Sequence, residues 1–264
     1  MTEKIDKVVI FAGGKGTRLS ELTVDTPKPL VEIGGEPVVV HIMRHFYRHG
    51  CREFVLATGY KSNDFKRYFR DYAFNNASVS FVKGEMKIHS CKEAEDWTVH
   101  VVETGDEATT SQRLTAVRPY LGDDDFFLTY GDSLSDVDLK KLAKVHRENG
   151  TAATLTAVTK GERFGILNID GAGVVTKFRE KATASEQLIN GGFIACSNRL
   201  LDWVDVDSGD FGFETLASLS DAGELGYHRH DGWWFAMDTK SEKDELEKIY
   251  VEKPELFGRQ NTAD

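Results

Sequence analysis

The feature that most constrains the fold of this chain is a short apolar run that ends in a glycine-rich turn. Residues 8–11 read VVIF, a mostly β-branched run that predicts a buried strand. Residues 12–18 then read AGGKGTR. Glycines let a backbone turn sharply and bring bare N–H groups close to a ligand, and Lys15 and Arg18 add positive charge. A strand that ends in such a turn favours phosphate binding.

Two common nucleotide-binding loops are excluded at this turn. No Gly-Lys-Ser/Thr follows, so the P-loop pattern is absent, and Leu19 stands where the Rossmann pattern G-x-G-x-x-G needs its third glycine. Residues 27–29 read PKP, and the two prolines fix the backbone on both sides of Lys28. We therefore expect a phosphate site with a lysine held in place. A glycine turn in another kind of α/β protein is the alternative.

The composition limits the partners of the chain. It has 264 residues, of which 40% are hydrophobic, enough for the core of one large or two small domains. The 33 Lys and Arg against 43 Asp and Glu give a net charge of −10. Such a chain lacks the basic footprint of a nucleic-acid-binding protein, so we expect no nucleic-acid partner. Lys15, Arg18 and Lys28 form a local exception, to which a metal ion would add positive charge.

Three features predict a cytoplasmic protein without a membrane partner. The cysteines, Cys51, Cys91 and Cys196, are far apart and form no C-x-x-C pattern, which favours a reducing compartment. No apolar run approaches the ~20 residues of a membrane span. Residues 1–6 are polar and acidic, unlike a signal peptide.

Strands and helices alternate along residues 1–150, which predicts a mostly parallel sheet with helices on both faces. The expected strands there are 8–11, 54–57, 79–82 and 126–130, with β-rich residues 85–103, and the expected helices are 38–49, 61–74, 108–120 and 138–149. Ser135 or Asp136 is the expected cap of the last helix.

After residue 150 the pattern becomes richer in strands. We expect them at 152–158, 164–169, 174–178, 188–195 and 224–230, with a helix at 240–252 near the end. No linker or repeat interrupts the chain. The pattern predicts one continuous domain over residues 1–264, whose C-terminal part adds β structure over the binding edge of the sheet.

Two aspartates follow apolar strands. Asp132 comes after FFLTYG and Asp238 after FAM. Open α/β folds bind ligands at the carboxyl ends of their strands, and Mg²⁺ takes one or two carboxylates together with phosphate oxygens. The two aspartates are therefore candidate metal ligands, although any two aspartates at strand ends show the same pattern.

These motifs resemble the signature of the sugar-1-phosphate nucleotidylyltransferases. The resemblance begins with G-G-x-G-T-R-L and the downstream K-P, and it covers nearly the whole chain. Further matching motifs are PVVVHIM at 37–43, Trp97, TGD at 104–106, RL at 113–114, TYGD at 129–132, RFG at 163–165, INGGF at 189–193 and MDT at 237–239. Together they resemble the glucose-1-phosphate cytidylyltransferase branch, and residues 84–113 are the most branch-specific part.

The resemblance implies a fold and a reaction. The fold is a Rossmann-like, GT-A-like nucleotide-binding sheet in residues 1–150, with a β-rich sugar-binding half in residues 151–264. The enzyme would combine CTP and a sugar 1-phosphate, in this branch α-D-glucose 1-phosphate, into a CDP-sugar and pyrophosphate. The resemblance also implies Mg²⁺ as the cofactor and a homo-oligomer as the working form.

The resemblance assigns roles residue by residue. Catalytic roles fall to Arg18 and Lys28, and metal binding to Asp132 and Asp238. Nucleotide binding falls to Ala12, Gly13, Gly14, Lys15, Gly16, Thr17, Thr110, Arg113 and Gly131. Sugar-phosphate binding falls to Gly165, Glu180, Lys181, Asn190 and Gly191. The chain departs from the family pattern Glu-Lys-Pro at Ala182, which removes the rigidity that proline gives to the preceding lysine.

Other functions share parts of this pattern. A GT-A glycosyltransferase, a non-catalytic regulatory homologue, and a nucleotidylyltransferase for another sugar or polyol phosphate are the alternatives. Residues 136–138 read DVD and mimic the D-x-D motif of metal-dependent glycosyltransferases, but we expect them to begin a helix.

Some of these residues also have a purely structural interpretation. A helix-surface threonine is the structural alternative for Thr110, and a tight strand end is the one for Asn190. His41, His45 and His49 recur every four residues on one helix, where we expect a packing or solvated face rather than a metal site.

Overall fold

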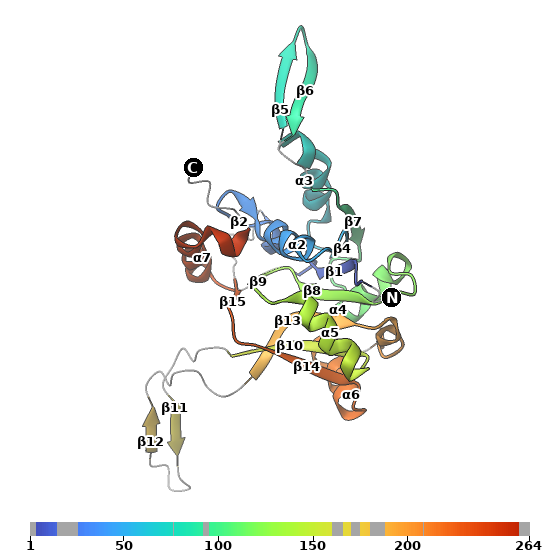
Figure 1. The fold of residues 1–264 in the computed structure, drawn as a ribbon, viewed down its shortest axis with the longest axis vertical. Coiled ribbons are helices and arrows are strands. Elements are labelled where there is room, and N and C mark those ends of the chain that lie inside the picture. Colours follow the sequence, from blue (N-terminus) through green and yellow to red (C-terminus); the bar gives the residue numbers. More distant parts are fainter. Residues whose placement is uncertain are drawn as a thin grey trace.

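A seven-stranded, mainly parallel sheet forms the centre of the molecule (Figure 1). The structure is a computed structural model that describes residues 4–14, 26–75, 77–91, 95–159, 166–169, 175–179, 188–207 and 209–258. The strand order is β14 (Leu225–His230), β10 (Ala153–Thr159), β13 (Leu188–Cys196), β8 (Phe126–Tyr130), β1 (Lys7–Phe11), β4 (Glu53–Thr58) and β7 (Thr98–Glu103). β1 pairs in parallel with both β4 and β8. The predicted α/β class with a mostly parallel sheet is confirmed.

The C-terminal strands widen this sheet. The expected position over the binding edge holds for β15 (Trp234–Ala236), which pairs with β9 (Ser133–Ser135) just after β8, whereas β10, β13 and β14 extend the central sheet instead. β13 pairs antiparallel with β8 and β10, and β10 pairs in parallel with β14. Residues 193–196 of β13 are buried, so the strand requires neighbours in the sheet and apolar cover on both faces. Because β13 runs against β8, its first residues lie at the edge where β8 ends.

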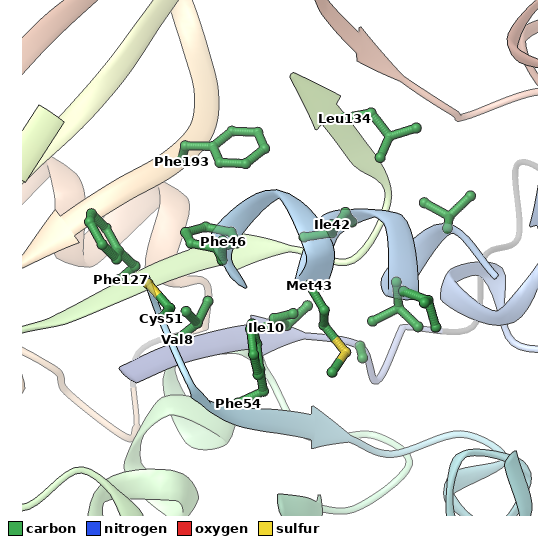
Figure 2. Packing of buried hydrophobic residues seen from close by; sticks show 14 of the residues in the cluster. Val8, Ile10, Ile42, Met43, Phe46, Cys51, Phe54, Phe127, Leu134 and Phe193 are labelled. Carbon is green, nitrogen blue, oxygen red and sulfur yellow. The ribbon is translucent and has the colours of Figure 1, made fainter. Parts of the chain in front are cut away.

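Alternate residues of β1 face two separate cores. Val8 and Ile10 lie in one core, and Val9 and Phe11 lie in the other, as the two-residue period of a strand requires. The first core is covered by α2 (Val38–Arg48), α3 (Ser62–Asn75), α5 (Leu139–Asn149) and α7 (Lys240–Glu252), and the second by α4 (Thr110–Val117) and α6 (Leu216–Asp221). Figure 2 shows side chains of α2 packed over β1 in the first core.

Shorter elements complete the described chain. Two-stranded sheets pair β2 (Glu32–Ile33) with β3 (Glu36–Pro37), β5 (Ala77–Val82) with β6 (Glu85–Cys91), β9 (Ser133–Ser135) with β15 (Trp234–Ala236), and β11 (Ile166–Ile169) with β12 (Val175–Arg179). The helical turns are η2 (Lys28–Leu30), η3 (Arg118–Tyr120), η4 (Asn198–Asp202), η5 (Phe211–Thr215) and η6 (Pro254–Phe257). The β5–β6 hairpin projects away from the central sheet (Figure 1). Within the described ranges, every helix is too short or too polar to cross a bilayer.

The cap of α5 differs from the expectation of Ser135 or Asp136. Asp138 caps this helix, and its carboxylate accepts hydrogen bonds from the backbone N–H groups of Lys140 and Lys141. Asp136 instead pairs with His230 at 2.9 Å. The expected helix start within the D-x-D mimic is confirmed, because Asp138 is the N-cap of α5. Both aspartates of the motif therefore have structural partners.

The histidines of α2 form a packing face, as expected. His41 and His45 are buried, and their Nε2 atoms lie 2.9 Å from the carbonyl oxygens of Ile33 and Val137. Nδ1 of His49 lies 2.9 Å from the carbonyl oxygen of His45. Among the described residues, no group of three or more His, Cys, Asp or Glu side chains could hold a metal ion.

We expect the buried side chain of His146 to make the folded protein less stable in acid. His146 on α5 is buried, and its Nδ1 lies 2.9 Å from the hydroxyl oxygen of Thr154. Burial, followed by the nearby charges of Arg147 and Arg199, lowers the pKa of His146 from 6.5 to about 4. The unfolded chain therefore takes up this proton first, and stability falls as the pH drops from 6.5 to 4. At pH 5 the loss is about 2 kcal/mol.

His146→Gln should weaken the pH dependence of stability. The substituted chain is expected to be less stable than the parent at pH 7.5, but to lose about 2 kcal/mol less between pH 7.5 and pH 5.0. Urea unfolding at the two pH values measures the difference. The control is His89→Gln, which replaces an exposed histidine on β6. An equal change in the parent and in His146→Gln would contradict the prediction.

Candidate active site

A pocket of about 350 Å³ opens at the carboxyl ends of β1 and β8. Its lining includes Phe11, Ala12, Gly13, Gly14, Lys28, Pro29, Thr110, Arg113, Tyr130, Gly131, Asp132 and Asp210. The carboxyl edge of a parallel sheet is where open α/β folds bind ligands. Of the residues assigned to nucleotide binding, catalysis and metal binding, every described one except Asp238 lines this pocket, and Asp238 contacts Lys28.

Lys28 lies between the two aspartates that the sequence pairs as metal ligands. Its Nζ donates to Oδ2 of Asp132 at 2.6 Å and to Oδ1 of Asp238 at 2.8 Å. Only 13% of the Lys28 side chain is exposed, so the ammonium is held by its partners rather than by solvent. Two carboxylates that converge on one nitrogen form a cation site.

Local packing explains how these three residues meet. A Cβ atom at Gly131 would lie 2.9 Å from Cγ of Pro29 and 3.0 Å from the carbonyl oxygen of Phe11. Glycine at 131 therefore lets η2 pack against the end of β8, which places Lys28 beside Asp132. The backbone N–H of Met237 donates to the carbonyl oxygen of Asp132 at 3.0 Å, which brings Asp238 to the same place. Thr239 and Glu242 then form a capping box that starts α7 directly after Asp238.

The protonation of Lys28 decides what chemistry it can perform. Burial lowers its pKa, but the carboxylates of Asp132 and then Asp238 outweigh burial and raise the pKa above its ordinary value of 10.5. The side chain therefore stays cationic at neutral pH and cannot act as a general base there. Its ammonium can neutralise charge on a phosphate or hold the two carboxylates together.

The same carboxylates fit a hard divalent cation. Both lie within 2.8 Å of a single atom, so their oxygens can belong to one coordination sphere. Two protein carboxylates leave the other positions to water and phosphate oxygens, which is the donor set that Mg²⁺ prefers. In the present arrangement the Lys28 ammonium occupies the position between these oxygens, so a metal ion would compete with it for the carboxylates.

The side chain of Arg113 fixes the start of the glycine-rich turn by hydrogen bonds. The side chain is buried, and its guanidinium donates to the carbonyl oxygens of Gly13 at 3.1 Å, Thr58 at 3.1 Å and Gly105 at 3.0 Å. It also donates to Oγ1 of Thr104 at 2.5 Å. A Cβ atom at Gly13 would lie 2.1 Å from the guanidinium, so the turn needs glycine there. The nucleotide contact assigned to Arg113 remains a prediction, and the structure adds a positioning role.

Arg113→Lys is expected to disturb the turn. An ammonium cannot reach acceptors spread around a planar guanidinium, so buried carbonyl groups lose their donors. We expect a loss of about 1–3 kcal/mol in the free energy of unfolding. The KM for the nucleotide should rise about tenfold, the effect of about 1.4 kcal/mol in binding. Steady-state kinetics and urea unfolding measure both, with Arg118→Lys as the control because Arg118 pairs with Asp202 on the surface. A stable variant with an unchanged KM would contradict this role.

Thr110 lies at the start of α4, on the wall of the pocket. Its Oγ1 accepts a hydrogen bond from the backbone N–H of Phe211 at 2.8 Å. No described residue accepts the hydroxyl proton in return, so the proton can be donated to a ligand. Thr109 and Gln112 form a capping box that fixes this end of the helix. Thr110 is partly exposed and lines the pocket, and the nucleotide contact assigned to it remains a prediction.

Asn190 and Gly191 begin the part of β13 that approaches the pocket. Oδ1 of Asn190 accepts the N–H of Gly192 at 2.9 Å, and the carbonyl oxygen of Gly191 accepts the indole N–H of Trp234 at 2.8 Å. Gly192 has a φ of +84°, and a Cβ atom there would lie 2.9 Å from the ring of Tyr130. Neither Asn190 nor Gly191 lines the pocket, and the side chain of Asn190 is exposed, so the sugar contacts assigned to both remain predictions.

Two lining residues with titratable side chains, Tyr130 and Asp210, have no role assigned from the sequence. Asp210 places a carboxylate there while its Oδ1 accepts the N–H of Gly212 at 2.6 Å. Tyr130 is largely buried, and burial, followed by Asp210 and Asp132, raises its pKa to about 12. The motif TYGD contains Tyr130, but no motif marks Asp210, which reads as an ordinary helix cap.

The remaining assigned residues lie outside the described part of the chain. They are Lys15, Gly16, Thr17 and Arg18 of the glycine-rich turn, and Gly165, Glu180 and Lys181 of the sugar-phosphate set.

Comparison with known proteins identifies the family. Residues 7–234 match the family described as nucleotidyl transferase. The chain belongs to this family. Glucose-1-phosphate cytidylyltransferase from Salmonella typhi is 42% identical over 92% of this chain and 95% of the relative. The probable glucose-1-phosphate cytidylyltransferase of Bacillus subtilis is 39% identical over 95% of this chain and 98% of the relative. The resemblance to this enzyme family is therefore confirmed.

Solved structures agree with the fold. HddC from Yersinia pseudotuberculosis, in a crystal structure with GMP-PN, has a TM-score of 0.67 at 20% identity and covers 93% of this chain and 100% of its own. UDP-glucose pyrophosphorylase from Acinetobacter baumannii has a TM-score of 0.67 at 17% identity and covers 96% of both chains. Nucleotidyltransferases of this family generally use a divalent metal, in agreement with the carboxylate pair.

Proposed function

We propose that this enzyme transfers the cytidylyl group of CTP to α-D-glucose 1-phosphate and releases pyrophosphate. The observation that carries the proposal is the cluster of Lys28, Asp132 and Asp238 beside the glycine-rich turn. The choice of CTP and glucose 1-phosphate rests on the relatives that are 42% and 39% identical over nearly their whole length.

In the proposed reaction, a phosphate oxygen of the sugar 1-phosphate attacks the α-phosphorus of CTP. The bond from that phosphorus to the oxygen bridging the β-phosphate breaks, and pyrophosphate leaves with the electron pair. The attacking phosphate is already an anion at neutral pH, so no general base is needed. Alignment of two anions and neutralisation of their charge are what the protein must supply.

The described residues can supply both. Gly13 and Gly14 line the pocket where the triphosphate would lie, and Arg113 keeps this segment in place. The Lys28 ammonium is held at the carboxyl end of β8, where it can pair with the reacting phosphates. Thr110 can donate to the nucleotide. Arg18 completes the phosphate contacts in the proposal, and Lys181, Glu180 and Gly165 the contacts to the sugar phosphate.

We propose Mg²⁺ as the metal, held by Asp132 and Asp238. Bound there, it would neutralise charge on the phosphate oxygens and favour departure of pyrophosphate. As metal and nucleotide enter, Lys28 would exchange its carboxylate partners for phosphate oxygens. The exchange keeps the ammonium paired with an anion in both states.

The proposal also covers how the chain is organised. Residues 1–150 bind the nucleotide and residues 151–264 the sugar, within one domain, and the enzyme works as a cytoplasmic homo-oligomer without a membrane or nucleic-acid partner. The central sheet, which contains strands from both halves, and the net charge of −10 support this organisation. Light scattering after gel filtration tests the oligomer.

A pyrophosphate-release assay tests the reaction. Four nucleoside triphosphates are each combined with a panel of sugar 1-phosphates in the presence of Mg²⁺. CTP with glucose 1-phosphate is expected to give the highest kcat/KM, with equal amounts of CDP-sugar and pyrophosphate. Higher activity with another sugar or polyol phosphate would replace glucose as the substrate. No turnover with any pair would contradict the enzyme class, and sugar transfer from CDP-glucose without pyrophosphate would indicate a glycosyltransferase.

A further inference from the structure

A second cavity lies at the opposite edge of the central sheet. It has a volume of about 390 Å³ and is bordered by residues that precede β1, by the end of α2, by the start of β8 and by α5. The candidate active site lies at the carboxyl ends of β1 and β8, whereas this cavity lies at their amino ends. Five-residue strands separate the two edges by about 15 Å. The cavity therefore belongs to neither the nucleotide nor the metal site.

The polar side chains that line the cavity are basic. Lys4 precedes β1, Arg48 and His49 lie at the end of α2, and Lys140 and Arg147 lie on α5. No Asp or Glu lines the cavity within the described parts of the chain. In a protein of net charge −10, basic groups from three separate segments converge on one concave surface. A phosphorylated small molecule is a ligand that such a surface attracts.

Carboxylates near Lys4, Arg48 and Lys140 do not neutralise these three cations. Asp138 is used as the cap of α5, where it accepts from two backbone N–H groups. Asp6 approaches Lys4 only to 4.0 Å, and both side chains are at least half exposed. Neither Arg48 nor Lys140 forms an ion pair with any described residue. Ion pairing among the described residues thus does not account for Lys4, Arg48 and Lys140.

Helix electrostatics accounts for only part of this arrangement. Arg48 and His49 stand at the carboxyl end of α2, where positive charge is favourable. Lys140 stands in the first turn of α5, where the helix dipole disfavours a cation. A bound anion would offset that cost, because it would pair with Lys140 and with the cations on the other segments.

The floor of the cavity can accept an uncharged group. Phe127, Leu139 and Ala143 line it, and each is nearly inaccessible to solvent. A cavity of this volume with an apolar wall and a few convergent charged groups has the character of a small-molecule site.

We propose that this cavity is a second binding site, for a small phosphorylated molecule whose phosphate groups pair with Lys4, Arg48, His49 and Lys140. The uncharged part of the ligand lies against the apolar wall. Because the site is at the far edge of the sheet, it can be filled while the candidate active site is occupied.

Inorganic pyrophosphate, CTP and CDP-glucose are suitable probes. Equilibrium dialysis at constant ionic strength compares a cavity variant, Lys4→Glu with Lys140→Glu, with a control, Lys141→Glu with Lys144→Glu. The control residues are exposed on the same helix, do not line the cavity and give the same change in net charge. For at least one probe, the cavity variant is expected to bind one equivalent fewer per chain, or to bind it at least tenfold more weakly, than the control. The probe that binds most tightly identifies the preferred form of the ligand.

Equal binding of all three probes by the cavity variant and the control would overturn the proposal. Amine footprinting of the unmodified protein gives an independent test if the variant folds poorly. The bound probe should protect Lys4 and Lys140 from acetylation but leave Lys144 reactive. A lack of protection at Lys4 and Lys140, or equal protection of all three lysines, would also overturn it. Turnover at low anion concentration should be the same in the cavity variant and the control.

Discussion

Lys28→Ala is expected to lower kcat about 10²–10³-fold, the range seen when one preorganised charge-stabilising donor is removed from an active site. The KM for CTP should change less than tenfold. The ammonium is prepositioned by Asp132 and Asp238 at the edge of the pocket, so its pairing with phosphate should strengthen as charge develops during transfer. Because other groups in the pocket also bind the triphosphate, loss of one cation should affect the rate more than the affinity.

A control separates this effect from a general loss of charge. Lys66→Ala removes an exposed lysine of α3 that pairs with Glu103 away from the pocket, and it should leave kcat within about twofold. Steady-state kinetics with both substrates varied measures kcat and each KM. Unchanged turnover in Lys28→Ala would remove this lysine from the mechanism. A rise in KM alone would assign it to substrate binding only.

The central part of the fold could be predicted because its pattern is local. Residues 8–11 are apolar without alternation, and the structure buries this strand on both faces. The helices expected at 38–49, 61–74, 108–120, 138–149 and 240–252 agree with the structure within a few residues at each end. The placement of the C-terminal strands could not be predicted in this way. Whether β13 joins β8 or crosses above it depends on pairing between segments about 65 residues apart, and burial alone does not fix the neighbour.

The candidate site likewise has features that the sequence predicts and features that it does not. Asp132 and Asp238 follow apolar strands, so a site at the strand ends could be expected from the sequence. The position of Lys28 between them could not, because the contacts span 104 and 210 residues. The buried guanidinium of Arg113 is a further case. Most of its partners are backbone carbonyl groups, of the glycine-rich turn, of the end of β4 and of the loop after β7, and backbone acceptors leave no mark on the sequence.

Removal of either carboxylate from the cation site should have the largest effect of all. Asp132→Asn and Asp238→Asn are each expected to lower kcat/KM about 10³-fold, since several kcal/mol of charge stabilisation depends on the metal. Each change leaves one charged ligand in the site, so the affinity for Mn²⁺, used as a spectroscopic substitute for Mg²⁺, should also fall. Lys28→Ala should have the opposite effect on Mn²⁺ affinity in the absence of nucleotide, because the ammonium that competes for both carboxylates is gone.

The matched control for these changes is Asp136→Asn. Asp136 lies in the D-x-D mimic four residues beyond Asp132 but pairs with His230 and does not contact Lys28. Its replacement should leave Mn²⁺ affinity unchanged and kcat/KM within a few-fold of the parent. Titration of Mn²⁺ by electron paramagnetic resonance, without nucleotide and then with CTP, measures the affinities in all four variants. If Asp136→Asn lost the metal while Asp238→Asn kept it, the D-x-D residues would be the ligands and the cluster around Lys28 would be only structural.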